Sequence, residues 1–300
     1  MSWIVYGIVG VFLWAIANVF DKIMRASFLK STMPLVIGFT LVHFPLSLFL
    51  VIQNKAYLTP TNYLIPAFIS GVAITCAIMA YIKALSREEA SRVVTFFQLT
   101  PVFVLVLAAV FLKERLLVSE YLAFILLLSG GLLISIKKIK DQFHLSPAIW
   151  LMIVSCFCAA IAQTLLKFAH ALNSFWNIFS LFYFGMGSGY FILFVLNSKA
   201  RNNLFQTMKN KVFLFLLLSS GVLSFLGFML HNKAILTGPV TIVSTFSSIQ
   251  SFFVLVIATV LSIQFPKYIQ EDKNPKVLGV KLIAILLMFM GLALLSFGSF

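Results

Sequence analysis

Charged residues are scarce in this chain of 300 residues. They make up 10% of it and only eight are acidic, whereas 61% of the residues are hydrophobic and the mean hydropathy is +1.06. A soluble core of this length cannot bury so much apolar surface. The composition therefore excludes an ordinary soluble globular protein and predicts a membrane protein.

Cysteine is also rare, and the usual chemical motifs are missing. Cys76, Cys156 and Cys158 fall within predicted helices and offer no disulfide framework. No metal-ligand spacing, phosphate-binding loop or nucleophile beside a plausible base occurs in the sequence. We therefore expect no enzyme activity, no metal and no cofactor. The net charge of +14 is spread over loops rather than gathered into one patch, so we expect no nucleic-acid partner.

Long apolar runs fill most of the sequence. Runs close to the ~20 residues needed to cross a hydrocarbon layer of ~30 Å recur with short polar breaks between them. We predict ten membrane-spanning helices, at residues 3–20, 33–52, 63–85, 91–112, 119–136, 147–170, 174–196, 212–236, 239–263 and 277–298. No basic residue precedes Trp3, so the first span is interpreted as a permanent helix rather than a cleavable signal peptide.

The chain repeats itself. Residues 83–110 return without a gap as residues 233–260, and eleven of the positions are identical. Each half, 1–142 and 143–300, then holds five spans, and an odd number turns the second half upside down relative to the first. The predicted fold is an all-α integral membrane protein, with ten transmembrane helices as two inverted five-helix repeats. Many secondary transporters build a central site in this way.

Several short motifs occur in an order and spacing typical of a known five-helix unit: Lys83-Ala84-Leu85, Pro101-Val102-Phe103, the run from Phe111 to Leu116, and Ser129-Gly130-Gly131. By these motifs the whole chain resembles the drug/metabolite transporter superfamily, in its ten-helix EamA-type branch. The second half departs from the pattern, with Gln250-Ser251 and Ile263-Gln264 where the family has Glu-Pro and Gly-Glu. The resemblance implies a secondary transporter of small metabolites, often an exporter, with a central cavity lined by helices one, three, four, six, eight and nine.

The acidic residues bear on the substrate, because all eight lie at the ends of predicted spans or in loops, Asp21 among them. Small multidrug resistance proteins, distant relatives in this resemblance, carry a glutamate in their first helix, and Trp14 and Ala159 hold the equivalent places here. An unpaired charge in hydrocarbon costs at least ~2.5–3.5 kcal/mol, so cations would lack a partner. The repeated pairs Lys22 with Lys167 and Lys83 with Lys233 instead favour an anionic or zwitterionic solute, such as an amino acid.

Polar and aromatic residues within the spans or at their ends are the candidate substrate-binding residues. These are Trp14, Asn18, Tyr81, Lys83, Gln98, Gln163, Lys167, His231, Asn232, Lys233, Ser244, Ser248 and Gln250. Each type has a structural alternative, because terminal lysines snorkel to the headgroups, amides bridge neighbouring helices and small hydroxyl residues let helices pack closely. Pro101 is expected to loosen its helix and act in gating. His43, alone in its span, is interpreted as structural.

Basic residues are distributed unevenly between the two sides. Sixteen lie in or beside the loops after odd-numbered spans and five on the opposite side. The positive-inside rule places the odd loops in the cytoplasm and both termini outside, whereas the family commonly has both termini inside. We expect a multi-pass protein of the inner (plasma) membrane, monomeric because a single-chain inverted repeat needs no partner, in contact with membrane lipid and a small-molecule substrate.

The expected function is a secondary transporter, an exporter or exchanger, that moves a small polar metabolite by alternating access around a central cavity. The alternative is a flippase for a lipid-linked headgroup or an accessory membrane subunit. A hydrated central cavity with Asn18 and Gln163 in its wall would favour the carrier, and a lateral groove open to lipid would favour the flippase.

Overall fold

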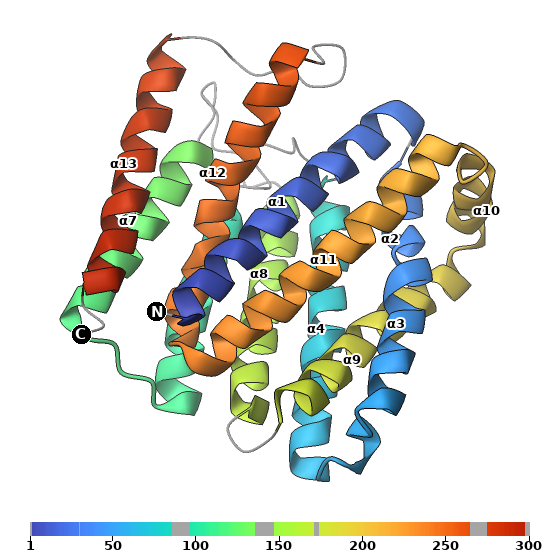
Figure 1. Cartoon of the computed structure of the whole chain (residues 1–300), viewed down its shortest axis with the longest axis horizontal. Coiled ribbons are helices and arrows are strands. Elements are labelled where there is room, and N and C mark those ends of the chain that lie inside the picture. The colour runs from blue at the N-terminus through green and yellow to red at the C-terminus, as the bar shows by residue number, and fades with distance from the viewer. Residues whose placement is uncertain are drawn as a thin grey trace.

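The computed structural model describes residues 2–29, 31–85, 96–135, 147–170, 174–264 and 275–297, and helices make up nearly all of these ranges (Figure 1). No strand occurs within the described ranges. The apolar character of the helices all round, rather than along one stripe, is what a membrane-embedded bundle requires.

The described part of the first half contains six α-helices and three short helical turns. The α-helices are α1 (Ser2–Phe28), α2 (Met33–Gly38), α3 (Thr40–Gln53), α4 (Thr61–Leu85), α6 (Leu99–Leu107) and α7 (Val118–Ser135). The short turns are η1 (Ala56–Leu58), η2 (Phe96–Gln98) and the π-helical turn η3 (Ala108–Leu112).

Within the described residues of the second half there are also six α-helices. They are α8 (Pro147–His170), α9 (Phe175–Leu196), α10 (Ser198–Thr207), α11 (Lys211–Thr237), α12 (Val240–Gln264) and α13 (Pro275–Phe297). Only α10 has no counterpart among the predicted spans, because its sequence is polar and short.

Six helical segments of the described chain are long and apolar enough to cross a membrane. They are Trp3–Phe28, Met33–Gln53, Thr61–Tyr81, Ile149–His170, Phe175–Leu196 and Lys211–Thr237. Four shorter apolar helices overlap the remaining predicted spans: Leu99–Leu112, Val118–Gly130, Val240–Val254 and Ile283–Leu294. The described chain thus has the composition of a multi-pass membrane protein, while the count of ten spans stays a prediction.

Two span boundaries differ from the sequence prediction. Helix α1 continues to Phe28, eight residues past the predicted end, because the exposed side chains of Lys22 and Arg25 can leave the apolar layer while their backbone stays helical. The second predicted span is divided at Phe39 into α2 and α3. The first difference moves Asp21 from a span end into the body of a helix.

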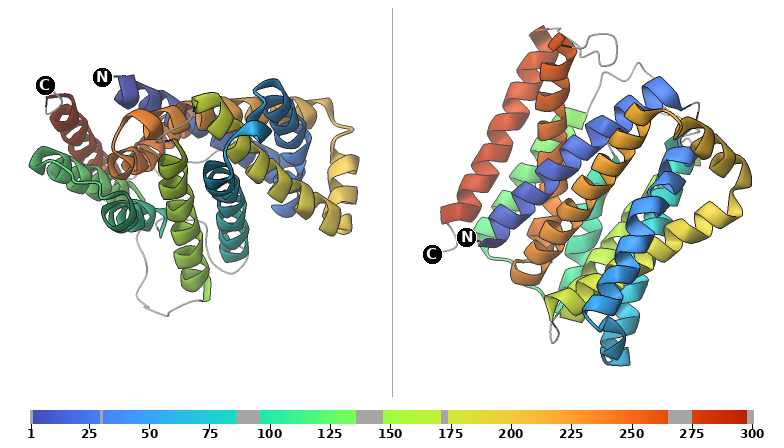
Figure 2. Two further views of the ribbon diagram at one scale, coloured as in Figure 1. Left: turned by 90° about the horizontal axis from the view of Figure 1, so that it is seen from below. Right: turned by 45° about the vertical axis from the view of Figure 1, so that its right-hand side comes forward.

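The helices pair across the two halves. Helix α1 packs along α11, and α4 packs along α8, while α7 and α13 form a separate pair at one edge of the molecule (Figures 1 and 2). The sequence repeat makes α1 the counterpart of α8 and α4 the counterpart of α11. An inverted duplication predicts this exchange of partners. The inversion itself stays a prediction.

Glycines allow two of these crossings to come very close. On α1, a Cβ atom added to Gly10 would lie 3.1 Å from the carbonyl oxygen of Gly227 on α11. On α4, a Cβ atom added to Gly71 would collide with the backbone of α9 at Phe182, and one on Gly185 would collide with the carbonyl of Phe68. Backbone-to-backbone approach at small residues is a common way for membrane helices to associate.

Candidate functional site

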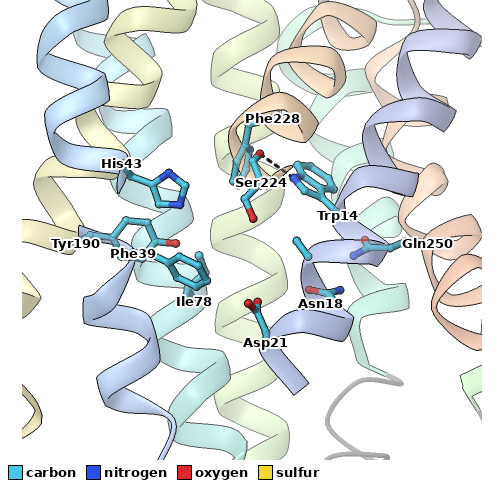
Figure 3. A pocket seen from close by; sticks show the side chains of 11 residues that line it. Trp14, Asn18, Asp21, Phe39, His43, Ile78, Tyr190, Ser224, Phe228 and Gln250 are labelled. Atoms are coloured by element: carbon cyan, nitrogen blue, oxygen red, sulfur yellow. Dashed lines mark hydrogen bonds between the residues drawn. The ribbon is translucent and has the colours of Figure 1, made fainter. Parts of the chain in front are cut away.

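A cavity of about 220 Å³ lies within the helical bundle (Figure 3). Six helical elements contribute to it: α1, the α2–α3 junction with the start of α3, α4, α9, α11 and α12. Its lining residues are Trp14, Ala17, Asn18, Asp21, Phe39, His43, Ile78, Tyr190, Ser224, Phe228 and Gln250.

Helix α1 supplies one wall of the cavity. Trp14, Asn18 and Asp21 are separated by four and three residues, which places them on one helical face. The indole nitrogen of Trp14 donates a hydrogen bond to the backbone oxygen of Ser224 on α11 at 3.3 Å. The side chain of Asn18 is exposed and no hydrogen bond joins it to any described residue. This face of α1 therefore offers an aromatic ring, an unpaired amide and a carboxylate.

Asp21 is expected at the end of the first span, and the structure places it within helix α1, where it lines the cavity. It is inside the apolar segment Trp3–Phe28, and its side chain points toward the centre of the cavity (Figure 3). The hydroxyl of Ser220 donates a hydrogen bond to Oδ1 of Asp21 at 2.6 Å. Among the residues that the structure describes, no lysine or arginine forms an ion pair with Asp21.

An aromatic cluster forms the opposite wall. The ring centroids of His43 and Tyr190 are 5.6 Å apart and their planes are inclined by 22°. The Phe39 ring completes a triangle with them, with its centroid 5.5 Å from that of His43 and 6.4 Å from that of Tyr190. Nδ1 of His43 shares a hydrogen bond with the hydroxyl of Tyr183, a fully buried residue of α9. The interpretation of His43 as structural is therefore incomplete, because the ring also lines the cavity.

On α12, only Gln250 of the predicted polar residues lines the cavity. Ser244 and Ser248 are buried, and the Ser244 hydroxyl donates to the carbonyl of Thr241 in its own helix at 2.6 Å. Gln163, the repeat partner of Asn18, is also off the cavity, and its Oε1 is buried without a hydrogen bond to a described residue.

None of the predicted lysines lines the cavity. Nζ of Lys167 instead reaches the end of α11, where it donates to backbone oxygens of residues 235, 236 and 238. Lys233 lies over the rings of Tyr6 and Phe175, at 5.6 Å and 5.4 Å from their centroids. Lys83 is exposed at the end of α4. Because these lysines lie outside the cavity, they do not support an anionic solute in it.

Two further candidates lie just behind the cavity wall. His231 contacts Trp14 with ring centroids 4.9 Å apart, and the amide nitrogen of Asn232 donates to the backbone oxygen of Phe228 at 2.7 Å. Tyr81 packs against Phe97, with ring centroids 4.8 Å apart, and does not line the cavity. His231 and Asn232 can therefore position lining residues.

Two predicted residues lie near the beginning of α6. The side chain of Gln98 is outside the part of the chain that the structure describes. Pro101 is buried as the third residue of α6, where the helix begins. A proline in the first turn is compatible with regular helix geometry, and the role of Pro101 in gating stays a prediction.

Glu114 holds the beginning of α12. Its carboxylate accepts hydrogen bonds from the backbone amides of Val240 at 3.0 Å and Thr241 at 3.1 Å. A carboxylate at a helix N-terminus satisfies free amides and complements the positive end of the helix dipole. Since Glu114 comes from the first half and α12 from the second, this contact joins the halves.

The cavity is nearer to one end of the bundle. Helices α1, α4 and α9 correspond to the first, third and seventh predicted spans. Asp21, Ile78 and Tyr190, which line the cavity from these helices, lie in the C-terminal half of each helix, toward the loops that follow odd-numbered spans. The contacts made by Glu114 and Lys167 lie at the opposite end, where α11 gives way to α12. At the same end the rings of Trp3 and Phe246 are stacked, with their centroids 6.1 Å apart.

Comparison with known proteins agrees with the membrane fold. Residues 1–136 match the EamA-like transporter family, which confirms the predicted resemblance to the drug/metabolite transporter superfamily over this part of the chain. One solved crystal structure is similar with a TM-score of 0.69 and 12% sequence identity, covering 99% of this chain and 96% of its own. At that identity the likeness shows the fold alone. No protein of curated function matches the sequence.

Proposed function

We propose that the protein is a secondary transporter, an exporter or exchanger, that carries a small polar metabolite through this cavity by alternating access. The observation that carries the proposal is a cavity with polar groups at Asn18, Asp21 and Gln250, inside an apolar helical bundle whose first 136 residues match a family of transporters. Its volume of about 220 Å³ is below the ~300–1,000 Å³ of pockets for drug-sized ligands, so the solute is small.

The arrangement of the bundle supports a state that is closed at the end where α11 meets α12. Glu114 and Lys167 hold that end, and the cavity lies toward the odd-numbered loops. By the distribution of basic residues those loops are cytoplasmic. The proposed resting state is therefore closed to the outside and accessible from the inside, with both termini outside.

The test is solute counterflow in proteoliposomes that contain the purified protein. Vesicles are loaded with a mixture of unlabelled amines, amino acids and carboxylates, and the entry of each labelled compound is followed. Flux of at least one compound that depends on internal solute supports the carrier. Flipping of a fluorescent phospholipid without any solute flux would refute it and support the flippase alternative.

A matched pair of variants shows whether flux uses this cavity. Ser224→Phe places a ring in the cavity wall, whereas Val222→Phe adds the same ring on the same helix at a position that is 51% exposed. We expect Ser224→Phe to abolish counterflow and Val222→Phe to retain it. Equal flux from both variants would mean that solute follows another route.

A further inference from the structure

We propose that the solute carries a protonated amine on a compact aromatic or apolar body, and that Asp21 is its counter-charge. This inference names the substrate class of the site in the proposed function, and it rests on that function. It replaces the expectation of an anionic solute, which came from lysines that do not line the cavity.

The charge of the cavity is the first argument. Asp21 is the single acidic residue among its lining residues, and no lysine or arginine is among them. An unpaired carboxylate within the apolar part of a membrane protein is costly, and a bound cation offsets this cost. An anion in the same cavity would meet repulsion from Asp21 without a positive partner among the lining residues.

The geometry of Asp21 is the second argument. The Ser220 hydroxyl donates a hydrogen bond of 2.6 Å to Oδ1 of Asp21, and this hydrogen bond fixes the orientation of the carboxylate. No hydrogen bond joins Oδ2 to any described residue, although this atom is not buried away from solvent. In Figure 3 the carboxylate faces the middle of the cavity. An ammonium group there would form a charge-assisted hydrogen bond with an oxygen that is already oriented.

The remaining lining residues suit the rest of such a molecule. Aromatic rings border the cavity on several sides, at Trp14, Phe39, His43, Tyr190 and Phe228. Faces of Trp, Tyr and Phe within ~6 Å attract a cation and also pack against a flat apolar body. Across from the aromatic cluster, Asn18 and Gln250 offer amide groups that can bind a second polar group of the solute. Asp21 thus suits the amine of the solute, the aromatic rings suit its apolar body, and Asn18 with Gln250 suits a second polar group.

The experiment measures binding to the purified wild-type protein by calorimetry with four probes of one shape. Phenethylamine carries the ammonium, phenylalanine the ammonium and a carboxylate, 3-phenylpropionate the carboxylate alone, and phenethyl alcohol neither charge. We expect at least one ammonium probe to bind at millimolar concentration or below, at least tenfold more tightly than 3-phenylpropionate and the alcohol. The inference is overturned if neither ammonium probe binds, or if 3-phenylpropionate binds as tightly as the better of them.

Variants then locate the binding. Asp21→Asn removes the charge but keeps an oxygen that can accept the hydrogen bond from Ser220. We expect this variant to bind the ammonium probe with an affinity lower by about 30-fold or more. Glu120→Gln is the matched control, because Glu120 accepts a bond from the backbone of Leu117 in an exposed turn away from the cavity. Equal affinity of the Asp21→Asn and Glu120→Gln proteins for the ammonium probe would overturn the assignment of Asp21. If Asp21→Asn does not fold, the comparison of the four probes on the wild-type protein decides whether the cavity prefers an ammonium group.

The two proposals fail in different ways. If the ammonium probes bind through Asp21 but no solute shows counterflow, the site is correct and the transporter function is wrong. If a carboxylate shows counterflow that Asp21→Asn does not reduce, the transporter function holds and the amine assignment is wrong.

Discussion

Replacing Lys167 with methionine should destabilise the protein without changing what the cavity binds. Nζ of Lys167 donates to the backbone oxygens of Ile235 at 2.8 Å, Leu236 at 3.2 Å and Gly238 at 2.8 Å. Helix α11 ends at Thr237, so these carbonyls lie where a helix has no amide donors of its own left. Methionine keeps most of the apolar stem of lysine and removes only the ammonium group.

The expected loss can be estimated from these contacts. A buried acceptor that loses its donor costs ~1–3 kcal/mol, and losing a positive charge at a helix C-terminus costs a further ~0.3–1 kcal/mol. Lys167 is partly exposed, so water can replace some of the three bonds. We therefore expect the free energy of unfolding to fall by about 2–4 kcal/mol.

The assay is unfolding in mixed micelles with increasing dodecyl sulfate, followed by circular dichroism. Lys22, the repeat partner of Lys167, is exposed, so Lys22→Met is the control and should change stability by no more than ~0.5 kcal/mol. Calorimetry should show the same probe affinity for Lys167→Met as for wild type within about twofold, since Lys167 is outside the cavity. Equal stability of the two variants would refute the capping role, and a large loss of binding would return Lys167 to the site.

Two other contacts give predictions of the same kind. Glu114→Gln should cost ~1 kcal/mol and speed hydrogen exchange at the first amides of α12, because a neutral amide caps a helix less well than a carboxylate; unchanged exchange would contradict this. His43→Phe or Tyr183→Phe should each cost ~1–3 kcal/mol by leaving the other partner unpaired. The double variant should cost less than the sum in a double-mutant cycle, and additive losses would show that the two groups do not interact.

Hydropathy was sufficient to predict an all-helical membrane protein, but the end of the first helix differs from the predicted boundary. The apolar run ends at Phe20, so Asp21 was assigned to a span end. Helix α1 continues because Lys22 and Arg25 point outward and are exposed. A signal was available, since Asp21 follows Asn18 by three residues and therefore shares its helical face.

The other wall of the cavity could not be predicted from one sequence. His43 is 140 residues from Tyr183, and nothing local in the chain indicates that these two side chains meet. The lysines show the same limit, because nothing local in the sequence indicates which groups their ammonium groups contact. Lys167 interacts with helix-terminal carbonyls, although those carbonyls belong to α11 rather than to its own helix. Tertiary contacts of this kind decide which polar residue faces a cavity.

The repeat supplies a last prediction, at Gly71 on α4 and its counterpart Gly221 on α11. A methyl group on Gly71 would collide with the backbone of α9, whereas the three atoms nearest to one on Gly221 would be side-chain atoms of Val42, the closest at 2.8 Å. We expect Gly71→Ala to cost ~1–3 kcal/mol. Gly221→Ala should cost less, because its methyl group would overlap Val42 by less than a methyl group on Gly71 would overlap the backbone of α9.

The same unfolding assay ranks these variants, with Gly279→Ala as the control, because no atom of the residues that the structure describes lies within 4 Å of a Cβ atom there. If Gly221→Ala lowered the free energy of unfolding more than Gly71→Ala, the prediction would be wrong and the α3–α11 crossing would be the more tightly packed of the two. The expected order means that duplication kept both glycines while their surroundings diverged. The α4–α9 crossing then joins backbone to backbone and the α3–α11 crossing rests on Val42. In a carrier that moves its helices around the cavity, α3 and α11 are therefore expected to separate before α4 and α9 do.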